Sequence, residues 1–198
     1  AVAGWMKTHH NWDVEERWII KTPGVVFALA MAVKAFTEPG DAVLIEQPVY
    51  YPFSEVINDN GRRIVSNDLV LLEDNRYHID FEDFEKKIVD NNVKLFLLCS
   101  PHNPSGRVFT GEELLKLGDI CLKHNVIVVS DEIHSDFVFE GEHTVFCNVK
   151  KEFEKLGYEP QITQKGAVLV KLGGKDDKNA VVLAAHMDTL GGMVCQIM

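Results

Sequence analysis

The stretch VIVVSDEIHSDF, residues 126–137, passes from a hydrophobic strand directly into charged side chains. Its first four residues are all β-branched, which is typical of a buried strand. Asp131, Glu132 and His134 follow at the point where that strand is expected to end. Ligands of open α/β sheets bind outside the carboxyl ends of the parallel strands. We therefore expect this strand end to carry functional side chains.

Strands and helices are predicted to alternate around this stretch. Continuously apolar strands are expected at residues 41–48, 93–101 and 125–132, and helices at 22–36, 81–89 and 110–124. The last helix begins with a capping-box pattern, Thr110 and Glu113. The first has Thr22 as its predicted N-cap and Pro23 in its first turn, and its apolar residues on nearly every side predict that it is buried. The fold class is therefore predicted to be α/β, with a mostly parallel sheet flanked by helices.

The composition, with 30 acidic against 20 basic residues and a net charge of −10, argues against a nucleic-acid partner, because phosphate binding uses clustered Lys and Arg. No apolar run approaches the roughly twenty residues of a membrane-spanning helix, so no membrane partner is expected. The four cysteines stand far apart without a C-x-x-C pair, which favours a reduced, cytoplasmic protein. The chain starts without Met in a segment that reads as the middle of a helix, so we expect a truncated N-terminus.

Three segments place polar groups at strand or helix ends. TPGVV (22–26) offers backbone N–H groups at the start of a helix, where a phosphate can bind. SPHNPSG (100–106) presents Asn103 between two prolines, and SDEIH (130–134) presents Asp131. Taken singly, they are also consistent with ordinary capping and turn chemistry. Together they favour a site for a flat, phosphorylated, nitrogen-containing aromatic cofactor.

These segments, with PVYYPF (48–53), resemble the fold type I pyridoxal-phosphate (PLP) aminotransferases, and most closely their cystathionine β-lyase-type C–S lyase branch. The resemblance covers residues 1–146, which we interpret as a partial aminotransferase large domain. It implies PLP as the cofactor, a small amino acid as the substrate and a homodimeric assembly of the intact enzyme. It also implies that Asp131 stabilises the protonated pyridine ring, the electron sink of this chemistry.

The resemblance assigns a contact to each remaining cofactor residue. Gly24, Val25 and Val26 are expected to hold the phosphate, Tyr50 to stack on the ring, Asn103 to bind the ring hydroxyl, and His134 to occupy the place where many aminotransferases have a Tyr that touches this hydroxyl. Tyr51, next to Tyr50, remains an alternative for the stacking residue. The chemistry also needs a lysine that forms a Schiff base. Lys165 lies at about the family's distance downstream, although Gln164 precedes it where the family has Ser.

The pattern of the sequence changes near residue 146, where the alternation of apolar strands and helices ends. A helix is predicted at residues 148–160, followed by strands and turns with two Gly-Gly pairs, and the last strand, 180–186, leads into His186 and Asp188. Residues 147–198 resemble the N-terminal part of dinuclear-metal aminopeptidases of the glutamyl or deblocking type. This resemblance implies a partial α/β metallopeptidase-like segment in which His186 and Asp188 are two ligands of an incomplete zinc or cobalt site.

The sequence leaves three hypotheses for the function. The first is a PLP-dependent C–S β-lyase, or an aminotransferase, that acts on amino acids and is incomplete in this chain. The second is a metallopeptidase, which rests on the two ligands His186 and Asp188. The third is an inactive chimera or fragment that includes the start of a metal-dependent aminopeptidase.

Overall fold

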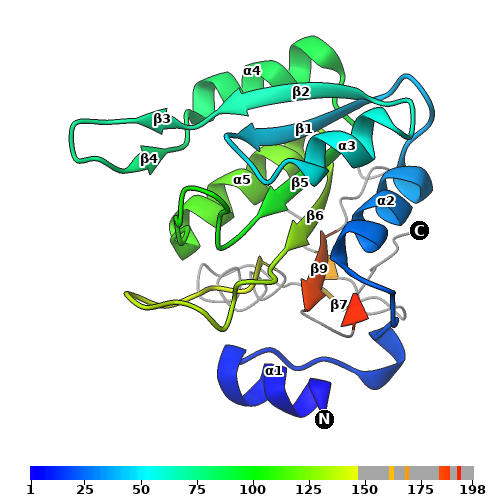
Figure 1. The fold of residues 1–198 in the computed structure, drawn as a ribbon, viewed down its shortest axis with the longest axis vertical. Coiled ribbons are helices and arrows are strands. Elements are labelled where there is room, and N and C mark those ends of the chain that lie inside the picture. The colour runs from blue at the N-terminus through cyan, green and yellow to red at the C-terminus, as the bar shows by residue number, and fades with distance from the viewer. Residues whose placement is uncertain (147–160, 163–167, 170–182, 188–190, 193–198) are drawn as a thin grey trace.

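The computed structural model describes residues 1–146, 161–162, 168–169, 183–187 and 191–192 (Figure 1). The helices are α1 (Val2–His10), η1 (Glu16–Trp18, a 3-10 helix), α2 (Val25–Phe36), α3 (Pro52–Asn58), α4 (Phe81–Asn91) and α5 (Gly111–Lys123). The strands are β1 (Ala42–Gln47), β2 (Arg63–Asp68), β3 (Val70–Leu71), β4 (Tyr77–His78), β5 (Leu95–Cys99), β6 (Ile127–Asp131), β7 (Gln161–Ile162), β8 (Val168–Leu169), β9 (Leu183–Met187) and β10 (Gly191–Gly192).

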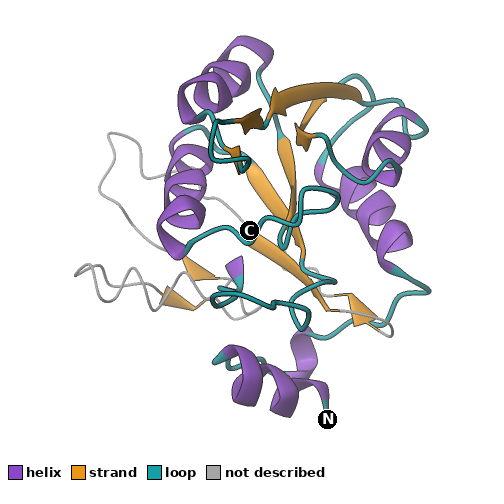
Figure 2. Cartoon of the chain, turned by 60° about the vertical axis from the view of Figure 1, so that its left-hand side comes forward, coloured by secondary structure: helices purple, strands orange, loops and turns teal. Residues whose placement is uncertain are grey.

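A six-stranded sheet in the order β10-β9-β6-β5-β1-β2 forms the centre of the described fold. Its strands pair in parallel from β2 to β9, and β10 pairs antiparallel with β9. Helices lie on both sides of the sheet (Figure 2). The predicted α/β class, with a mostly parallel sheet flanked by helices, is confirmed.

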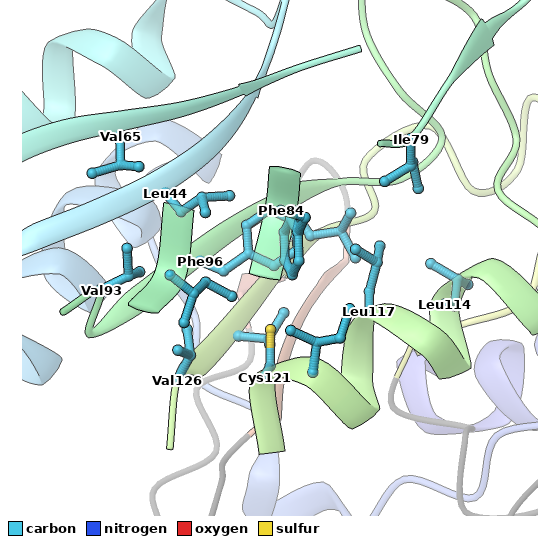
Figure 3. Packing of buried hydrophobic residues seen from close by; sticks show 14 of the residues in the cluster. Leu44, Val65, Ile79, Phe84, Val93, Phe96, Leu114, Leu117, Cys121 and Val126 are labelled. Atoms are coloured by element: carbon cyan, nitrogen blue, oxygen red, sulfur yellow. The ribbon is translucent and has the colours of Figure 1, made fainter. Parts of the chain in front are cut away.

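The central strands bury both of their faces, so alternate residues of one strand enter two different cores. Leu44 of β1 and Phe96 of β5 pack against α4 and α5, in the core shown in Figure 3. Val43 and Leu97, one position along each strand, pack instead against α2 and α3. This burial on both faces explains why these strands read as continuous apolar runs.

The local signals of the sequence identified most of these elements. The predicted strands correspond to β1, β5 and β6, and the predicted helices to α2, α4 and α5. The capping box of α5 is confirmed, since the side chain of Thr110 accepts from the N–H of Glu113 and the Glu113 carboxylate accepts from the N–H of Thr110. The helix predicted at residues 148–160 lies outside the described residues.

The prediction for α2 was wrong at its start and on one face. The N-cap is Gly24 rather than Thr22, whose hydroxyl instead donates to the carbonyl of Gly24 (3.1 Å). The helix is not buried all round either, because Phe27 and Met31 are 47% and 38% exposed. One face of α2 covers the sheet, while its neighbours leave the opposite face open.

The N-terminal segment forms a small core of its own at one end of the sheet. Met6 of α1, Trp12 and Trp18 pack together with Val145, which is distant in sequence. None of the helices in the described ranges is long and apolar enough to cross a membrane.

Glu46, the fifth residue of β1, is a carboxylic acid inside this apolar fold. It is 2% exposed, and neither of its carboxyl oxygens has a hydrogen-bond partner among the described residues. Burial raises the pKa of Glu46 from its ordinary 4.5 to about 8, with Glu113 adding to the rise and Arg107 opposing it. The folded protein therefore keeps a proton at neutral pH that the unfolded chain releases.

Glu46→Gln is expected to flatten the pH dependence of stability. Between about pH 4.5 and about pH 8 the folded state binds the extra proton, so the wild-type free energy of unfolding falls as pH rises, by up to about 1.4 kcal/mol per pH unit. The side chain of the variant cannot ionise, so the stability of the variant relative to the wild type should increase with pH across this window. Above about pH 8 the two free energies of unfolding should change with pH in the same way. Urea unfolding followed by circular dichroism measures the difference. Glu38→Gln, at an exposed carboxyl, should keep the wild-type slope, and an unchanged slope in Glu46→Gln would contradict the assignment.

Candidate functional site

The carboxyl ends of β5 and β6 and the start of α2 enclose a pocket of about 570 Å³. The residues that line it are Pro23, Gly24, Val25, Val26, Phe27, Leu29, Tyr50, Phe53, Cys99, Asn103, Asp131, Ile133 and His134. All seven residues that the sequence analysis assigned to a cofactor are among them. Segments that stand more than a hundred positions apart in the sequence thus meet in one place.

The start of α2 borders this pocket with unpaired backbone donors. The first N–H groups of an α-helix have no acceptor within the helix, and they form its positive end. Gly24 is the N-cap in an extended conformation (φ 164°), and no side chain caps the helix. The turn before α2 therefore leaves these donors available to an anion beside Gly24, Val25 and Val26.

Asp131 is the buried carboxylate of the pocket. It is the last residue of β6, where it pairs with Cys99 of β5, and it is only 4% exposed. Its Oδ1 accepts from the N–H of Ile133 (3.1 Å), and its carbonyl accepts from the N–H of Ser100 (2.9 Å). The sheet and the turn that follows it thus fix the position of this carboxylate.

The turn that carries Asn103 is tied to the two neighbouring strand ends. The N–H of Tyr50 donates to the carbonyl of Asn103 (2.9 Å), and the N–H of Asn103 donates to Sγ of Cys99 (3.4 Å). The ring of His102 lies between Ser105 Oγ (2.9 Å) and the carbonyl of Glu46 (3.2 Å). These contacts hold Asn103 beside the pocket by its backbone and leave its side-chain amide to the site.

His102 and Arg107 connect this turn to neighbouring elements by hydrogen bonds. Burial lowers the pKa of His102, so its imidazole is neutral in the folded protein near neutral pH. The guanidinium of Arg107 donates to the carbonyl of Tyr77 (2.7 Å) and to the Glu113 carboxylate at the start of α5. The turn is therefore fixed to β4 and α5 as well as to β1.

The two adjacent tyrosines take different positions. Tyr50 lines the pocket and is 41% exposed, whereas Tyr51 does not line it and is 65% exposed. Their ring centroids lie 5.3 Å apart at an interplanar angle of 62°, so the two rings meet edge to face. The pocket favours Tyr50 as the stacking residue.

The apolar wall of the pocket was missed in the sequence analysis. Phe27, Phe53 and Cys99 contribute to it. The Cys99 thiol is 3% exposed, and burial raises its pKa to about 12, so it is neutral in the pocket wall. The sequence did offer a signal for Cys99: it is the last apolar residue before SPHNPSG, and residues at the ends of parallel strands line such pockets.

A second, more polar cleft of about 870 Å³ adjoins the first. The β-hairpin of β3 and β4, the turn around Asn103 and residues 137–140 line it. Asn103 and His134 border both cavities. They therefore stand where the pocket opens toward the hairpin.

The remaining candidate residues are not brought into this site by the described structure. Lys165 and Asp188 lie outside the described residues. His186 belongs to β9, which pairs in parallel with β6, so its backbone lies at the sheet edge that also carries Asp131. Among the described residues there is no group of three or more His, Cys, Asp or Glu side chains that could hold a metal ion.

Comparison with known proteins identifies relatives of this arrangement. Residues 1–163 match the family aminotransferase class I and II. The chain is 54% identical over 154 residues to cystathionine beta-lyase PatB of Bacillus subtilis, which covers 77% of this chain and 40% of that protein. Cystalysin of Treponema denticola, whose crystal structure contains a pyridoxal 5'-phosphate cofactor, matches with a TM-score of 0.73 and 47% identity over 76% of this chain and 38% of that one. The chain spans about 40% of the length of these relatives.

The same comparisons bear on the C-terminal part of the chain. N-succinyldiaminopimelate aminotransferase of Mycobacterium tuberculosis matches with a TM-score of 0.76 and 21% identity over 98% of this chain and 46% of that one, a likeness of fold alone. The aminopeptidase resemblance of residues 147–198, with its zinc or cobalt site at His186 and Asp188, receives no support from the comparisons. Because the family match covers residues 1–163 and the Bacillus subtilis relative is 54% identical over 154 residues, the chain belongs to the aminotransferase class I and II family.

Proposed function

We propose that this chain forms the cofactor-binding part of a PLP-dependent enzyme, and that the enzyme is a C–S β-lyase acting on a small amino acid. The observation that carries the proposal is the single pocket that brings the start of α2, Tyr50, Asn103, Asp131 and His134 together. The lyase assignment is supported by the 54% identity to a cystathionine beta-lyase. Since the chain spans about 40% of that relative, the proposal concerns the part of the enzyme that holds the cofactor.

The pocket suits the charge pattern of PLP at both ends. The uncapped start of α2 offers N–H groups and a positive helix end for the phosphate beside Gly24, Val25 and Val26. Asp131 offers a buried carboxylate for the protonated ring nitrogen. A phosphorylated pyridinium carries both charges, so the two ends of the pocket complement the two ends of one molecule.

The residues between these ends are assigned to the ring. Tyr50, Asn103 and His134 all line the pocket. Tyr50 would stack on the ring face, the Asn103 amide would donate to the ring hydroxyl, and His134 would lie beside the same hydroxyl. The neutral Cys99 thiol in the wall is a weak nucleophile and adds no charge, so the Asp131 carboxylate acts on the ring nitrogen without a competing anion there.

PLP, when bound, supplies an electron-withdrawing ring that stabilises negative charge at the α-carbon of an amino acid. The contribution of Asp131 is to keep the ring nitrogen protonated, because a carboxylate in a buried site favours a cation beside it. Asn103 and His134 hold the ring hydroxyl, which sets the orientation of the ring in the pocket. Loss of a β-thiol from the substrate then follows from proton removal at its α-carbon.

A lysine is needed to hold and release that proton, and Lys165 is the candidate in this chain. The proposal also includes the homodimer that the family resemblance implies. Aminotransferase activity is the second candidate function, favoured by the family match itself. The alternative of an inactive chimera that contains part of an aminopeptidase has no support in the comparisons.

Asp131→Asn is expected to weaken binding of pyridoxamine 5'-phosphate tenfold to a hundredfold. Loss of a charge-assisted contact costs about 1.5–3 kcal/mol, and about 1.4 kcal/mol corresponds to a factor of ten. Equilibrium dialysis measures the dissociation constant, and this probe binds without condensing with a lysine, so it tests the pocket separately from Lys165. Asp90→Asn, at an exposed carboxylate of α4, is the matched control and should bind as the wild type does. Equal binding by Asp131→Asn would remove Asp131 from the site.

Borohydride reduction in the presence of PLP is expected to leave one phosphopyridoxyl group, on Lys165. This expectation rests on the sequence distance of Lys165 from SDEIH, and peptide mass spectrometry identifies the modified residue. Lys165→Arg should abolish this labelling while leaving the dissociation constant of pyridoxamine 5'-phosphate unchanged. Labelling scattered over many lysines would exclude Lys165 without affecting the assignment of the pocket.

A further inference from the structure

The strand end that carries Asp131 also carries a second buried carboxylate, Glu132. Asp131 lines the pocket, whereas Glu132 does not. The side chain of Glu132 is only 2% exposed. Glu132 is thus a buried carboxylate that lies next to the proposed cofactor ligand in the sequence but does not line the pocket.

Glu132 is surrounded by hydrogen-bond donors. Its Oε1 accepts from the hydroxyl of Ser130 (2.9 Å) and from the backbone N–H of Phe146 (2.8 Å). Its Oε2 lies 3.1 Å from Nε2 of His143, whose side chain is 3% exposed. The two oxygens of the Glu132 side chain thus contact Ser130, Phe146 and His143 at the same time.

These contacts join the end of the segment 132–146 to its first residue, Glu132. The far end of the segment is anchored in the core, because Phe146 is fully buried against α5 and other residues of that cluster. The middle of the segment is open, since Phe137 and Phe139 are 62% and 96% exposed. Glu132 therefore joins the two ends of this loop, whose middle contacts α1 through Asp136, which accepts from Nε1 of Trp5 (3.2 Å).

The backbone around Glu132 fixes the positions of Asp131 and His134, two of the pocket residues near it. The N–H of Ile133 donates to Oδ1 of Asp131 (3.1 Å), and the N–H of Ser135 donates to the carbonyl of Glu132 (2.9 Å). The first bond orients the Asp131 carboxylate, and the second forms the turn that presents His134. Both bonds depend on the path of residues 131–135, which the Glu132 side chain ties to the core.

We propose that Glu132 is a positioning residue that holds Asp131 and His134 in the cofactor pocket by closing the 132–146 loop. This inference rests on the proposed function for its consequence in cofactor binding. It assigns separate tasks to the two carboxylates of the SDEIH motif. Asp131 contacts the cofactor, and Glu132 contacts only protein.

Three variants separate a positioning role from a general loss of packing. Glu132→Ala leaves the three donors without an acceptor and should weaken binding of pyridoxamine 5'-phosphate at least tenfold. Glu132→Gln has the same shape and keeps an oxygen for Ser130 and Phe146. Its amide can face His143, because Nδ1 of that ring has no partner among the described residues and the proton can move there. This variant should therefore stay within about threefold of the wild-type dissociation constant. Glu142→Ala, at an exposed carboxylate of the same loop, is the control.

Hydrogen exchange supplies a measurement that does not depend on the cofactor. In Glu132→Ala the amides of Ile133, Ser135 and Phe146 should lose protection, while those of β1 and β5 keep it. Faster exchange in β1 and β5 as well would show a general loss of stability and would overturn the inference.

The two proposals fail differently. If the wild-type chain binds and Glu132→Ala binds equally well, the positioning role is overturned while the pocket assignment stands. If Glu132→Gln is as defective as Glu132→Ala, the shape of the side chain is not what matters, and the inference is again overturned. If the wild-type chain itself does not bind, the proposed function is overturned, and the exchange of Phe146 and its neighbours then decides whether Glu132 fixes the loop.

Discussion

The parallel pairing of β1, β5 and β6 is the constraint on which the site depends. Parallel strands place their carboxyl ends at one edge of a sheet, so the segments after β1, β5 and β6 must leave the sheet at the same edge. Both faces of these strands are already covered by helices, so the open edge is the place left for a pocket. Tyr50, Asn103 and Asp131 meet there because each follows or ends one of these three strands.

The meeting of these segments is maintained by backbone contacts rather than by the functional side chains. Tyr50 donates its N–H to the carbonyl of Asn103, and Ser100 donates its N–H to the carbonyl of Asp131. The side chains of Tyr50, Asn103 and Asp131 line the pocket. A buried backbone needs its hydrogen bonds satisfied in any case, so one set of contacts both completes the fold and aligns the site.

The elements that could be predicted are those whose sequences carry a local pattern, such as an apolar run or a capping box. Apolar runs predicted β1, β5 and β6, and Thr110 with Glu113 predicted the start of α5. The 7-residue helix α3 and the half-buried strand β2 were missed, because one is too short for a clear helical period and the other has only two fully buried residues, with a partly exposed residue between them. The exposure of Phe27 could not be predicted either, since it depends on which elements cover α2. The seven residues taken from the family resemblance line one pocket, but the apolar walls between them come from residues whose roles only the packing reveals.

The SDEIH motif illustrates why a local pattern stops short of a mechanism. From the local pattern alone, without the family resemblance, Asp131 and Glu132 are two equivalent carboxylates at a strand end. Asp131 is the last residue of β6 and Glu132 follows it, and their side chains lie on different sides of the backbone. One side holds the pocket, and the other holds Ser130, His143 and the N–H of Phe146. The two carboxyl groups also have separate hydrogen-bond partners, because the N–H of Ile133 donates to Asp131 and the three groups named above contact Glu132. The different surroundings of the two side chains become visible only in the folded chain, because the N–H of Phe146 must return to the Glu132 carboxyl group.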